Sequence, residues 1–213
     1  MASDCEDSAT AIETARLRLE PIGERHFEDL AALRAGPEVM ATMKDGPETR
    51  AETGATLARY RETWRAHGFG IWAVVERASG GFLGECGFWL RDDGLGVALR
   101  VALAASARGR GLAREAAAAA LDYGFVVAGL ERIVAVARQD NARSHALLEA
   151  LGMTLLATRA GTTAPLVVYG LERALWRARS STSPTAQASP TNTSPPAPQT
   201  RALPGIENSG TKA

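Results

Sequence analysis

The sequence predicts an α+β domain in which a mostly antiparallel, twisted sheet is flanked by helices. Three strand-like runs follow one another between residues 70 and 103, and the turns that join them are too short for a crossover helix, which indicates an antiparallel meander. Helix-like runs precede and follow this meander. With 213 residues, of which 46% are hydrophobic, the chain can bury one core, so we expect a single domain.

The N-terminal part of the chain supplies one strand and two helices. Alternation places Ala15, Leu17 and Leu19 on one face of the first strand, which Pro21 and Gly23 end. Glycines then close both helices, because glycine commonly follows the last helical residue. The expected elements are a strand over residues 14–19, a helix from residue 24 closed by Gly36-Pro37, and a helix over 47–67 stopped by Gly68.

The remaining runs complete the sheet. Two segments between strands, Ala78-Ser79-Gly80-Gly81 and Arg91-Asp92-Asp93-Gly94, consist of residues that favour tight turns. The expected strands cover residues 70–76, 81–90, 95–103, 133–137, 153–158 and 165–171, and the expected helices cover 111–127 and 141–151.

Both ends of the chain lack the residues needed for a core. The first residues are small, polar and acidic, and from about Arg179 the composition changes to Ser, Thr, Pro, Ala and Gln. Such segments bury too little apolar surface to offset the entropy lost on ordering. We therefore expect a disordered N-terminus over 1–11, a folded domain over 12–178 and a disordered tail over 179–213.

Charge and cysteine content exclude several classes of protein. The 24 basic residues balance the 24 acidic ones, so the chain lacks the positive footprint of a nucleic-acid-binding protein. Cys5 and Cys86 are too few for a disulfide framework, and the histidines show no metal-ligand spacing. No signal peptide or membrane span is visible. We expect a soluble, cytoplasmic protein without a metal, a nucleic-acid partner or a membrane partner, and its oligomeric state stays open.

The strongest functional signal is the segment Arg108-Gly109-Arg110-Gly111-Leu112-Ala113, which joins an extended run to an alanine-rich helical run. A strand that opens directly into a helix leaves backbone N–H groups unpaired at the positive end of the helix dipole. The two glycines let a ligand approach the backbone closely, and the arginines, with Arg114, add positive charge. This turn is therefore a candidate phosphate-binding site.

Other interpretations of this turn fit the residues to different degrees. A P-loop requires Gly-Lys-Ser/Thr, which is absent. A dinucleotide fingerprint requires a third glycine where this chain has Arg114. A plain strand-to-helix turn with solvated arginines stays open on these six residues alone.

Four stretches of the chain, taken in order, resemble one known family. They are Thr14-Ala15-Arg16-Leu17-Arg18-Leu19; Gly68-Phe69-Gly70-Ile71-Trp72-Ala73-Val74 with Phe82-Leu83-Gly84; the glycine-rich turn with Arg114-Glu115-Ala116; and Asn141-Ala142-Arg143-Ser144 with Leu151-Gly152-Met153. Together they resemble the GNAT family of N-acetyltransferases, most closely the branch that includes the ribosomal-protein N-terminal acetyltransferases. The resemblance covers roughly Glu13 to Trp176.

This resemblance implies a GNAT fold that binds acetyl-CoA, as co-substrate, in a splay between two central strands. The pantetheine arm would lie along the strand near Leu103, while Asn141 resembles the residue that reaches the pantetheine amide. From the sequence, Asn141 is also a candidate N-cap of its helix, and both interpretations stay open. The pyrophosphate would accept hydrogen bonds from the backbone of Arg108, Gly109, Arg110, Gly111, Leu112 and Ala113.

Acetyl transfer to an amine needs a neutral amine, a stabilised oxyanion and a proton for the leaving thiolate. Ser144 resembles the serine that the ribosomal-protein branch places near the sulfur, and its alternative role is that of a helix-start residue. Many family members instead present a tyrosine seven residues after the asparagine, where this chain has Leu148. The proton donor that we expect is therefore Ser144.

The family's usual strand carboxylate has no counterpart here, since Ala98 and Arg100 occupy the corresponding positions. Glu85, in an otherwise apolar strand, is the substitute base that we expect, because burial beside the cleft would raise its pKa and let it accept a proton through water. The alternative is that Glu85 lies on a solvated face of the sheet, between Gly84 and Cys86.

The expected function is acyl-CoA-dependent N-acetyl transfer to a primary amine, directly, in a ternary complex. A covalent intermediate is not expected, because Cys86 has no evident histidine partner. The missing tyrosine and carboxylate favour one alternative, a non-catalytic acyl-CoA-binding module; a dinucleotide-dependent oxidoreductase is disfavoured by Arg114. The acceptor, a protein N-terminus or a small amine, stays open. The resemblance implies that the helices near residues 24–67 and the loop near 159–164 build the acceptor pocket, and the charges expected there are mixed: Arg59, Arg61, Glu62 and Arg65.

Overall fold

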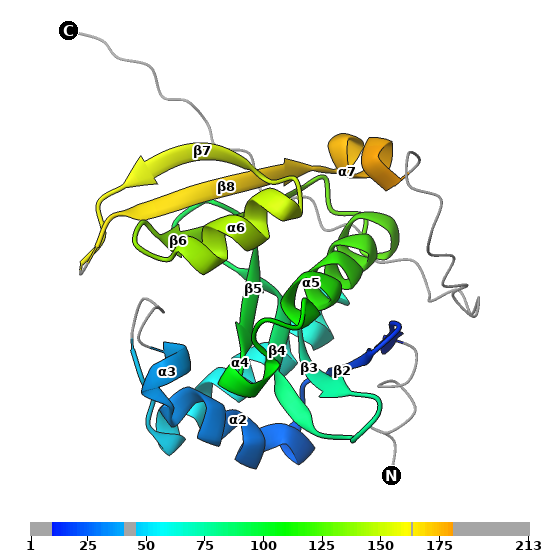
Figure 1. Cartoon of the computed structure of the whole chain (residues 1–213), viewed down its shortest axis with the longest axis vertical. Helices are drawn as coiled ribbons and strands as arrows, with labels where there is room; N and C mark the ends of the chain where they lie inside the picture. The colour runs from blue at the N-terminus through cyan, green and yellow to red at the C-terminus, as the bar shows by residue number, and fades with distance from the viewer. Residues whose placement is uncertain (1–9, 41–45, 163, 181–213) are drawn as a thin grey trace, which may run out of the picture.

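A computed structural model describes residues 10–40, 46–162 and 164–180. At its centre lies one sheet with the strand order β1-β2-β3-β4-β5-β6-β8-β7 (Figure 1). All neighbouring strands are antiparallel except β5 and β6, which are parallel, so the predicted α+β fold is confirmed. The strands are β1 Ile12–Glu13, β2 Leu17–Pro21, β3 Ile71–Glu76, β4 Phe82–Leu90, β5 Val97–Leu103, β6 Arg132–Arg138, β7 Thr154–Arg159 and β8 Leu166–Glu172.

Helices cover both faces of the sheet. Helices α5 and α6 pack on one face, and α2 and α4 pack on the other (Figure 1). The α-helices are α2 Phe27–Ala35, α3 Pro37–Met40, α4 Arg50–His67, α5 Leu112–Asp122, α6 Ala142–Ala150 and α7 Arg173–Ser180. Short 3-10 helices lie at η1 Glu24–His26 and η2 Ala105–Ala107, and the π-helix η3 Tyr123–Val127 continues α5.

The helix ends follow local signals in the sequence. Helix α4 begins after a reciprocal capping pair: the Thr49 hydroxyl accepts a hydrogen bond from the backbone N–H of Glu52, whose carboxylate accepts one from the Thr49 N–H at 2.7 Å. It ends at Gly68, which has a φ of 68°, in the left-handed region where glycine is favoured. The predicted stop at Gly68 is confirmed, while the start lies three residues after the predicted Pro47.

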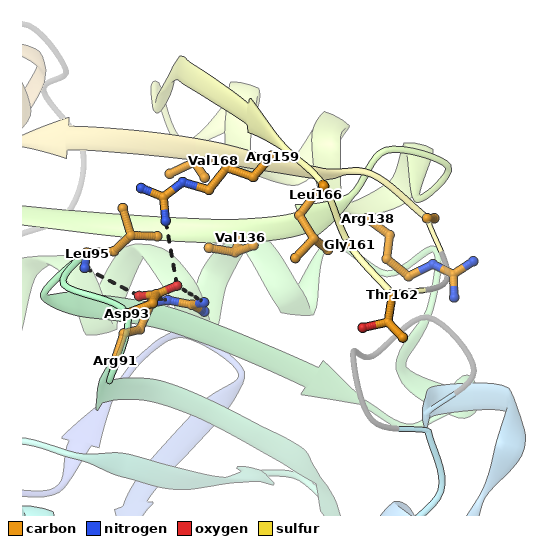
Figure 2. A pocket seen from close by; sticks show the side chains of 12 residues that line it. Arg91, Asp93, Leu95, Val136, Arg138, Arg159, Gly161, Thr162, Leu166 and Val168 are labelled. Atoms are coloured by element: carbon orange, nitrogen blue, oxygen red, sulfur yellow. Dashed lines mark hydrogen bonds and ion pairs between the residues drawn. The ribbon is translucent and has the colours of Figure 1, made fainter.

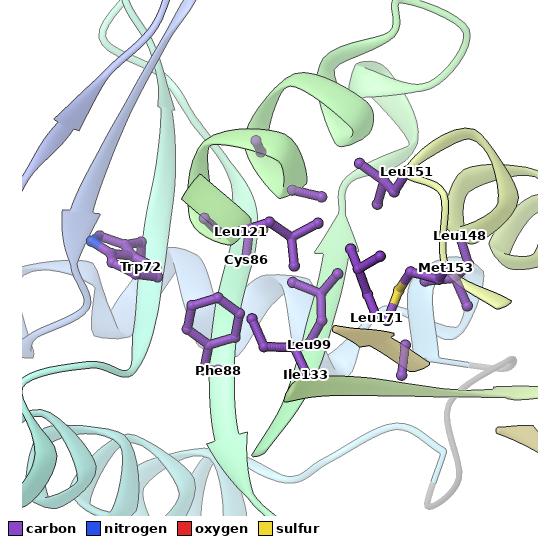
Figure 3. Close-up of a cluster of buried hydrophobic side chains, with 14 of the residues drawn as sticks. Trp72, Cys86, Phe88, Leu99, Leu121, Ile133, Leu148, Leu151, Met153 and Leu171 are labelled. Carbon is purple, nitrogen blue, oxygen red and sulfur yellow. The ribbon is translucent and has the colours of Figure 1, made fainter. Parts of the chain in front are cut away.

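Alternation along the strands separates the two faces of the core. On β4, the side chains of Cys86 and Phe88 face α5 and join the larger apolar cluster (Figure 3). On β3, Trp72 joins the same cluster, whereas Ile71 packs with Leu57 of α4 on the opposite face. Both sides of the central strands are therefore buried, which positions β4 and β5 as the rigid centre of the molecule.

The two parallel strands β5 and β6 diverge after a single point of pairing. They pair at Ala98 and Val134, and beyond this point each strand pairs only with its outer neighbour. The inner backbone edges of β5 and β6 are thus left without a strand partner in the middle of the sheet. This is the splay that the family resemblance implied, and an extended ligand could pair with its edges.

Some elements differ from those expected. The first strand was expected over 14–19 but lies at 17–21, after the short strand β1, and Pro21 is its last residue rather than its stop. Helices α3 and α7 were not predicted. Thr10, within the segment expected to be disordered, accepts a hydrogen bond from the indole of Trp72 at 2.9 Å. The rest of that segment up to residue 9 and the tail from 181 lie outside the described residues.

Candidate active site

The backbone conformation of the glycine-rich turn is set by its two glycines. Gly109 and Gly111 have φ values of 70° and 73°, conformations that other residues rarely adopt. Gly111 precedes α5, and no side chain caps the helix. Among the described residues, no acceptor receives a hydrogen bond from the N–H groups of 109–113. Unpaired N–H groups at the start of a helix are an arrangement that can bind an anion.

Contacts with the segment between β1 and β2 and with α3 brace this turn. The guanidinium of Arg16 donates to the carbonyl of Arg110 at 2.8 Å and to the carboxylate of Glu115 at 2.7 Å. Burial alone would raise the pKa of Glu115, but hydrogen bonds from Thr14 and Arg16 outweigh it, and the pKa is lowered. Arg108 donates to the backbone carbonyl of Glu38 at 2.6 Å. These bonds fix the turn relative to the sheet before any ligand binds.

A cavity of about 90 Å³ lies in the splay, next to α6. Its walls come from three elements that are distant in sequence. The lining includes Arg100 of β5, Val136 of β6, and Asn141, Ser144 and Leu148 at the start of and along α6. The structure therefore brings the predicted Asn141 and Ser144 together beside β5, whereas Leu103 lies beyond this lining, at the end of β5 nearest the glycine-rich turn.

Asn141 and Ser144 are linked to each other but keep unused polar groups. The side-chain oxygen of Asn141 accepts a hydrogen bond from the Ser144 N–H at 3.2 Å, so Asn141 is the N-cap of α6. In the described part of the chain, neither the Asn141 amide nitrogen nor the Ser144 hydroxyl makes a hydrogen bond. Both groups remain available to a ligand in the splay. The neighbouring His145 instead contacts the Tyr169 hydroxyl at 2.9 Å.

Glu85 is fully buried between two arginines. Its carboxylate accepts hydrogen bonds from Arg100 at 2.6 Å and from Arg34 at 2.9 Å. Burial raises the pKa of Glu85, but the charges of Arg100 and Arg34 outweigh it, so the pKa is lowered. The expected raised pKa is therefore wrong, and so is the alternative of a solvated face, because α2 covers this side of β4. Sequence reasoning missed both arginines as partners.

The same cluster extends into α4 and the segment before it. Arg34, which is 2% exposed, also forms an ion pair with Glu48 and donates to the Tyr60 hydroxyl at 2.6 Å. Burial and the Glu85 charge raise the pKa of Tyr60 to about 12. The cluster therefore joins α2, α4, β4 and β5 behind the splay through charged and polar bonds.

A second cavity, of about 450 Å³, opens on the face of the sheet opposite α6 (Figure 2). Val136 lines both cavities, so they adjoin at the splay. Charged side chains come from the β4–β5 turn, from β6 and from β7: Arg91, Asp93, Arg138 and Arg159. Residues of the loop near 159–164, which was expected to help build the acceptor pocket, line this cavity. The helix residues expected there do not; Arg65, for example, pairs with Glu62 on the exposed side of α4.

Three further observations concern the described residues. No group of three or more His, Cys, Asp or Glu side chains gathers there as a metal site would require. None of the helices described has both the length and the apolar character to cross a bilayer. Cys86 is buried, which raises the pKa of its thiol, so it is poorly suited to act as a nucleophile.

Comparison with known proteins identifies the family. Residues 16–154 match the model of the acetyltransferase (GNAT) domain. The chain is similar to the uncharacterized protein YkkB of Bacillus subtilis (strain 168), with 26% identity over 165 residues that cover 76% of this chain and 96% of YkkB. It is also similar to the structure of a protein of Bordetella pertussis assigned to the GNAT family, with a TM-score of 0.68, 28% identity, and coverage of 75% of this chain and 98% of that one.

The fold is shared as well with the ribosomal-protein-S5-alanine acetyltransferase of Vibrio fischeri. That structure gives a TM-score of 0.66 at 17% identity and covers 78% of this chain and 98% of its own. At this identity the likeness concerns the fold alone. The match to the domain model, however, covers well over half of this sequence and confirms the predicted family. The chain belongs to the GNAT family of acetyltransferases.

Proposed function

We propose that this protein transfers an acetyl group from acetyl-CoA to a primary amine, directly, in a ternary complex. One observation carries the proposal: the unpaired edges of β5 and β6 run from the N–H-lined turn at 108–113 to a cavity that holds Ser144. An extended donor with a pyrophosphate at one end and a thioester at the other matches this arrangement. GNAT enzymes use acetyl-CoA, which has this form.

Each part of the donor has a candidate partner. The pyrophosphate would accept hydrogen bonds from the N–H groups of the turn, which is at the positive end of α5. The pantetheine arm would pair with the inner edge of β5 near Leu103, as a strand does. The unused amide nitrogen of Asn141 would donate to a pantetheine carbonyl. These three contacts would place the thioester in the splay cavity beside Ser144.

The reaction forms a C–N bond and breaks the C–S bond of the thioester. A backbone N–H on the free edge of β5 would stabilise the oxyanion of the tetrahedral intermediate. The Ser144 hydroxyl would give its proton to the leaving thiolate, and water would take the proton that the amine loses and return one to Ser144. The contacts of Glu85 favour a different role from the predicted base: it holds Arg100 at the wall of the cavity.

A second candidate, a non-catalytic acyl-CoA-binding module, is favoured by one residue. Leu148 lines the splay cavity and is buried, where many family members place a tyrosine that protonates the thiolate. If Ser144 does not supply this proton, the site would bind the donor without accelerating transfer. The two candidates predict the same donor binding and differ in turnover.

The test combines calorimetric titration with acetyl-CoA and an assay for CoA release in the presence of amines. We expect binding that is weakened at least about tenfold by Gly111→Asp, because the new carboxylate would repel the pyrophosphate. Gly129→Asp is the matched control, since Gly129 has a similar left-handed φ of 67° and a Cβ there would meet no atom within 4 Å, while the nearest atom to a Cβ at Gly111 is Arg16 Nη2 at 3.6 Å.

Turnover then separates the candidates. We expect Ser144→Ala to lower kcat at least about tenfold and Ser144→Thr, which keeps a hydroxyl, to lower it less. Binding without CoA release for any amine would favour the binding module. No binding of acetyl-CoA at saturating concentration would contradict both candidates.

A further inference from the structure

The 450 Å³ cavity beside the splay is lined by three arginines and one carboxylate (Figure 2). Arg91 and Asp93 lie on the β4–β5 turn, Arg138 ends β6, and Arg159 ends β7. Because this cavity adjoins the splay at Val136, an acceptor that occupies it can reach a thioester in the splay. The charged side chains of this cavity therefore influence which acceptors can bind.

Two of the arginines each form a bidentate pair with a carboxylate. Arg91 donates to both oxygens of Asp93, at 2.9 and 2.6 Å, and its guanidinium lies over the ring of Trp89. Arg138 donates in the same two-pronged manner to Asp140, at 2.9 and 2.6 Å. These bidentate pairs satisfy much of the charge on Arg91 and Arg138.

Arg159 differs from the other two. Its guanidinium approaches Asp93 at 3.8 Å, which is longer than a hydrogen bond, and makes no hydrogen bond within the described part of the chain. Asp93 already has other partners: it accepts hydrogen bonds from Arg91, which hold its pKa at about 2, and one from the Leu95 N–H. Figure 2 shows the Arg159 guanidinium directed into the space between β7 and the β4–β5 turn. Arg159 is thus a cation with unused donors that faces the cavity.

We infer that the acceptor amine carries an oxyanion, such as a carboxylate, and that Arg159 binds this group. The inference rests on the proposed acetyl transfer and names its substrate class. A planar guanidinium binds a carboxylate or phosphate through paired hydrogen bonds. The hydroxyl of Thr162 lines the same cavity and offers one more donor. A polycationic acceptor would instead meet repulsion from Arg159.

Matched pairs of amines test this class. The pairs are leucine with leucinamide, 4-aminobutyrate with 4-aminobutanamide, and 2-aminoethyl phosphate with ethanolamine; spermidine is the polycation. The first two pairs test a carboxylate and the third tests a phosphate. Because an amino amide has a less basic amine than the amino acid, a larger fraction of it is neutral and reactive. This difference works against the acid, so a preference for the acid reports on binding of the oxyanion.

Two readouts are needed for each amine: kcat/KM with acetyl-CoA, and calorimetric binding to the CoA-loaded protein, which requires no turnover. The variants are Arg159→Gln, Arg159→Lys and the control Arg132→Gln. Arg132 is a close match, since it forms one ion pair at 3.8 Å, with Glu172, and its side chain is 47% exposed against 48% for Arg159. Arg132 does not line the cavity.

We expect at least one acid to exceed its neutral partner about tenfold or more in both readouts. Arg159→Gln should reduce this preference about tenfold to a hundredfold, the effect of removing a hydrogen bond to a charged group, while Arg132→Gln should leave it intact. Arg159→Lys should retain part of it, because lysine keeps the charge but loses the bidentate geometry.

Three results would overturn the inference: neutral amines that equal their acids, spermidine as the best acceptor, or an acid preference that Arg159→Gln leaves unchanged. Each of these can occur while acetyl transfer proceeds, so they leave the proposed function standing. Conversely, the protein could bind the acids more tightly than their neutral partners in calorimetry and yet release no CoA. That result would contradict the proposed acetyl transfer but support an oxyanion-binding site at Arg159.

Discussion

Because Glu85 lies in a buried charge cluster, we expect the substitution Glu85→Gln to lower the free energy of unfolding strongly. Glu85 is fully buried and Arg34 is 2% exposed, so removal of the carboxylate leaves two guanidinium groups with less compensation. Removing one partner of a buried ion pair costs about 3–5 kcal/mol. Arg34 keeps its ion pair with Glu48, which favours the lower end of this range. We therefore expect a loss of about 3 kcal/mol, a large share of the roughly 5–15 kcal/mol that stabilises a typical domain.

Urea unfolding of wild type and Glu85→Gln, followed by tryptophan fluorescence, measures this loss. Glu24→Gln is the control, because the Glu24–Arg61 pair is exposed and its removal should change the free energy of unfolding by about 0–1 kcal/mol. Steady-state kinetics on the same variants completes the experiment. If Glu85→Gln loses less than about 1 kcal/mol of stability but lowers kcat more than about tenfold, Glu85 acts as a base and the structural interpretation is wrong.

Three further predictions concern the core and its titratable groups. Gly124→Ala should lose about 1–3 kcal/mol in urea unfolding, because its Cβ would lie 2.8 Å from the ring of Phe88, whereas Gly54→Ala, with its nearest neighbour at 3.8 Å inside α4, should gain about 0.5–1 kcal/mol; equal effects would contradict this packing. Burial lowers the pKa of His26 below the usual 6.5, so its contribution to stability is full above pH 6.5 and is lost as the pH falls through the lowered value. His26→Gln should therefore flatten the pH dependence of the unfolding free energy in that interval, and an unchanged slope would count against the assignment. Iodoacetamide should label Cys86 only when the protein unfolds, which peptide mass spectrometry reports, and rapid labelling of the native protein would show that the thiol is accessible.

Local signals in the sequence predicted most of the elements. Glycines mark the ends of α2 and α4, and each has the expected role: Gly36 caps α2, and Gly68 adopts the left-handed conformation after α4. Alternation also placed Leu17 and Leu19 on a buried face, although the strand itself begins later than predicted. Helix ends and strand alternation depend on a few neighbouring residues, so they can be predicted from the sequence alone.

The environment of Glu85 could not be predicted in the same way. Its partner Arg34 precedes it by 51 residues and belongs to a helix, and Arg100 follows on the next strand. A local pattern shows only a carboxylate that alternates with Gly84 and Cys86, which is equally typical of a solvated face. Whether the face is solvated or covered depends on how α2 packs, and that is decided by the tertiary structure.

The charged lining of the 450 Å³ cavity beside the splay could not be predicted from local sequence either. Arg159 and Asp93 lie on different hairpins, and only the sheet order places β7 and the β4–β5 turn on opposite sides of one cavity. The glycine-rich turn, in contrast, was identifiable because all of its N–H groups come from one short segment. Contiguous sites can therefore be located in this sequence, whereas the charge of the acceptor region requires the fold.

Hydrogen–deuterium exchange with and without acetyl-CoA tests the central claim most directly, because it reports where the donor lies. We expect acetyl-CoA to slow exchange of the backbone N–H groups along the free edge of β5, after Ala98, and in the turn at 109–113, which have no strand or turn partner there. Protection of both segments would place the donor in the splay. Saturating acetyl-CoA that leaves both segments unprotected would contradict the proposed binding mode.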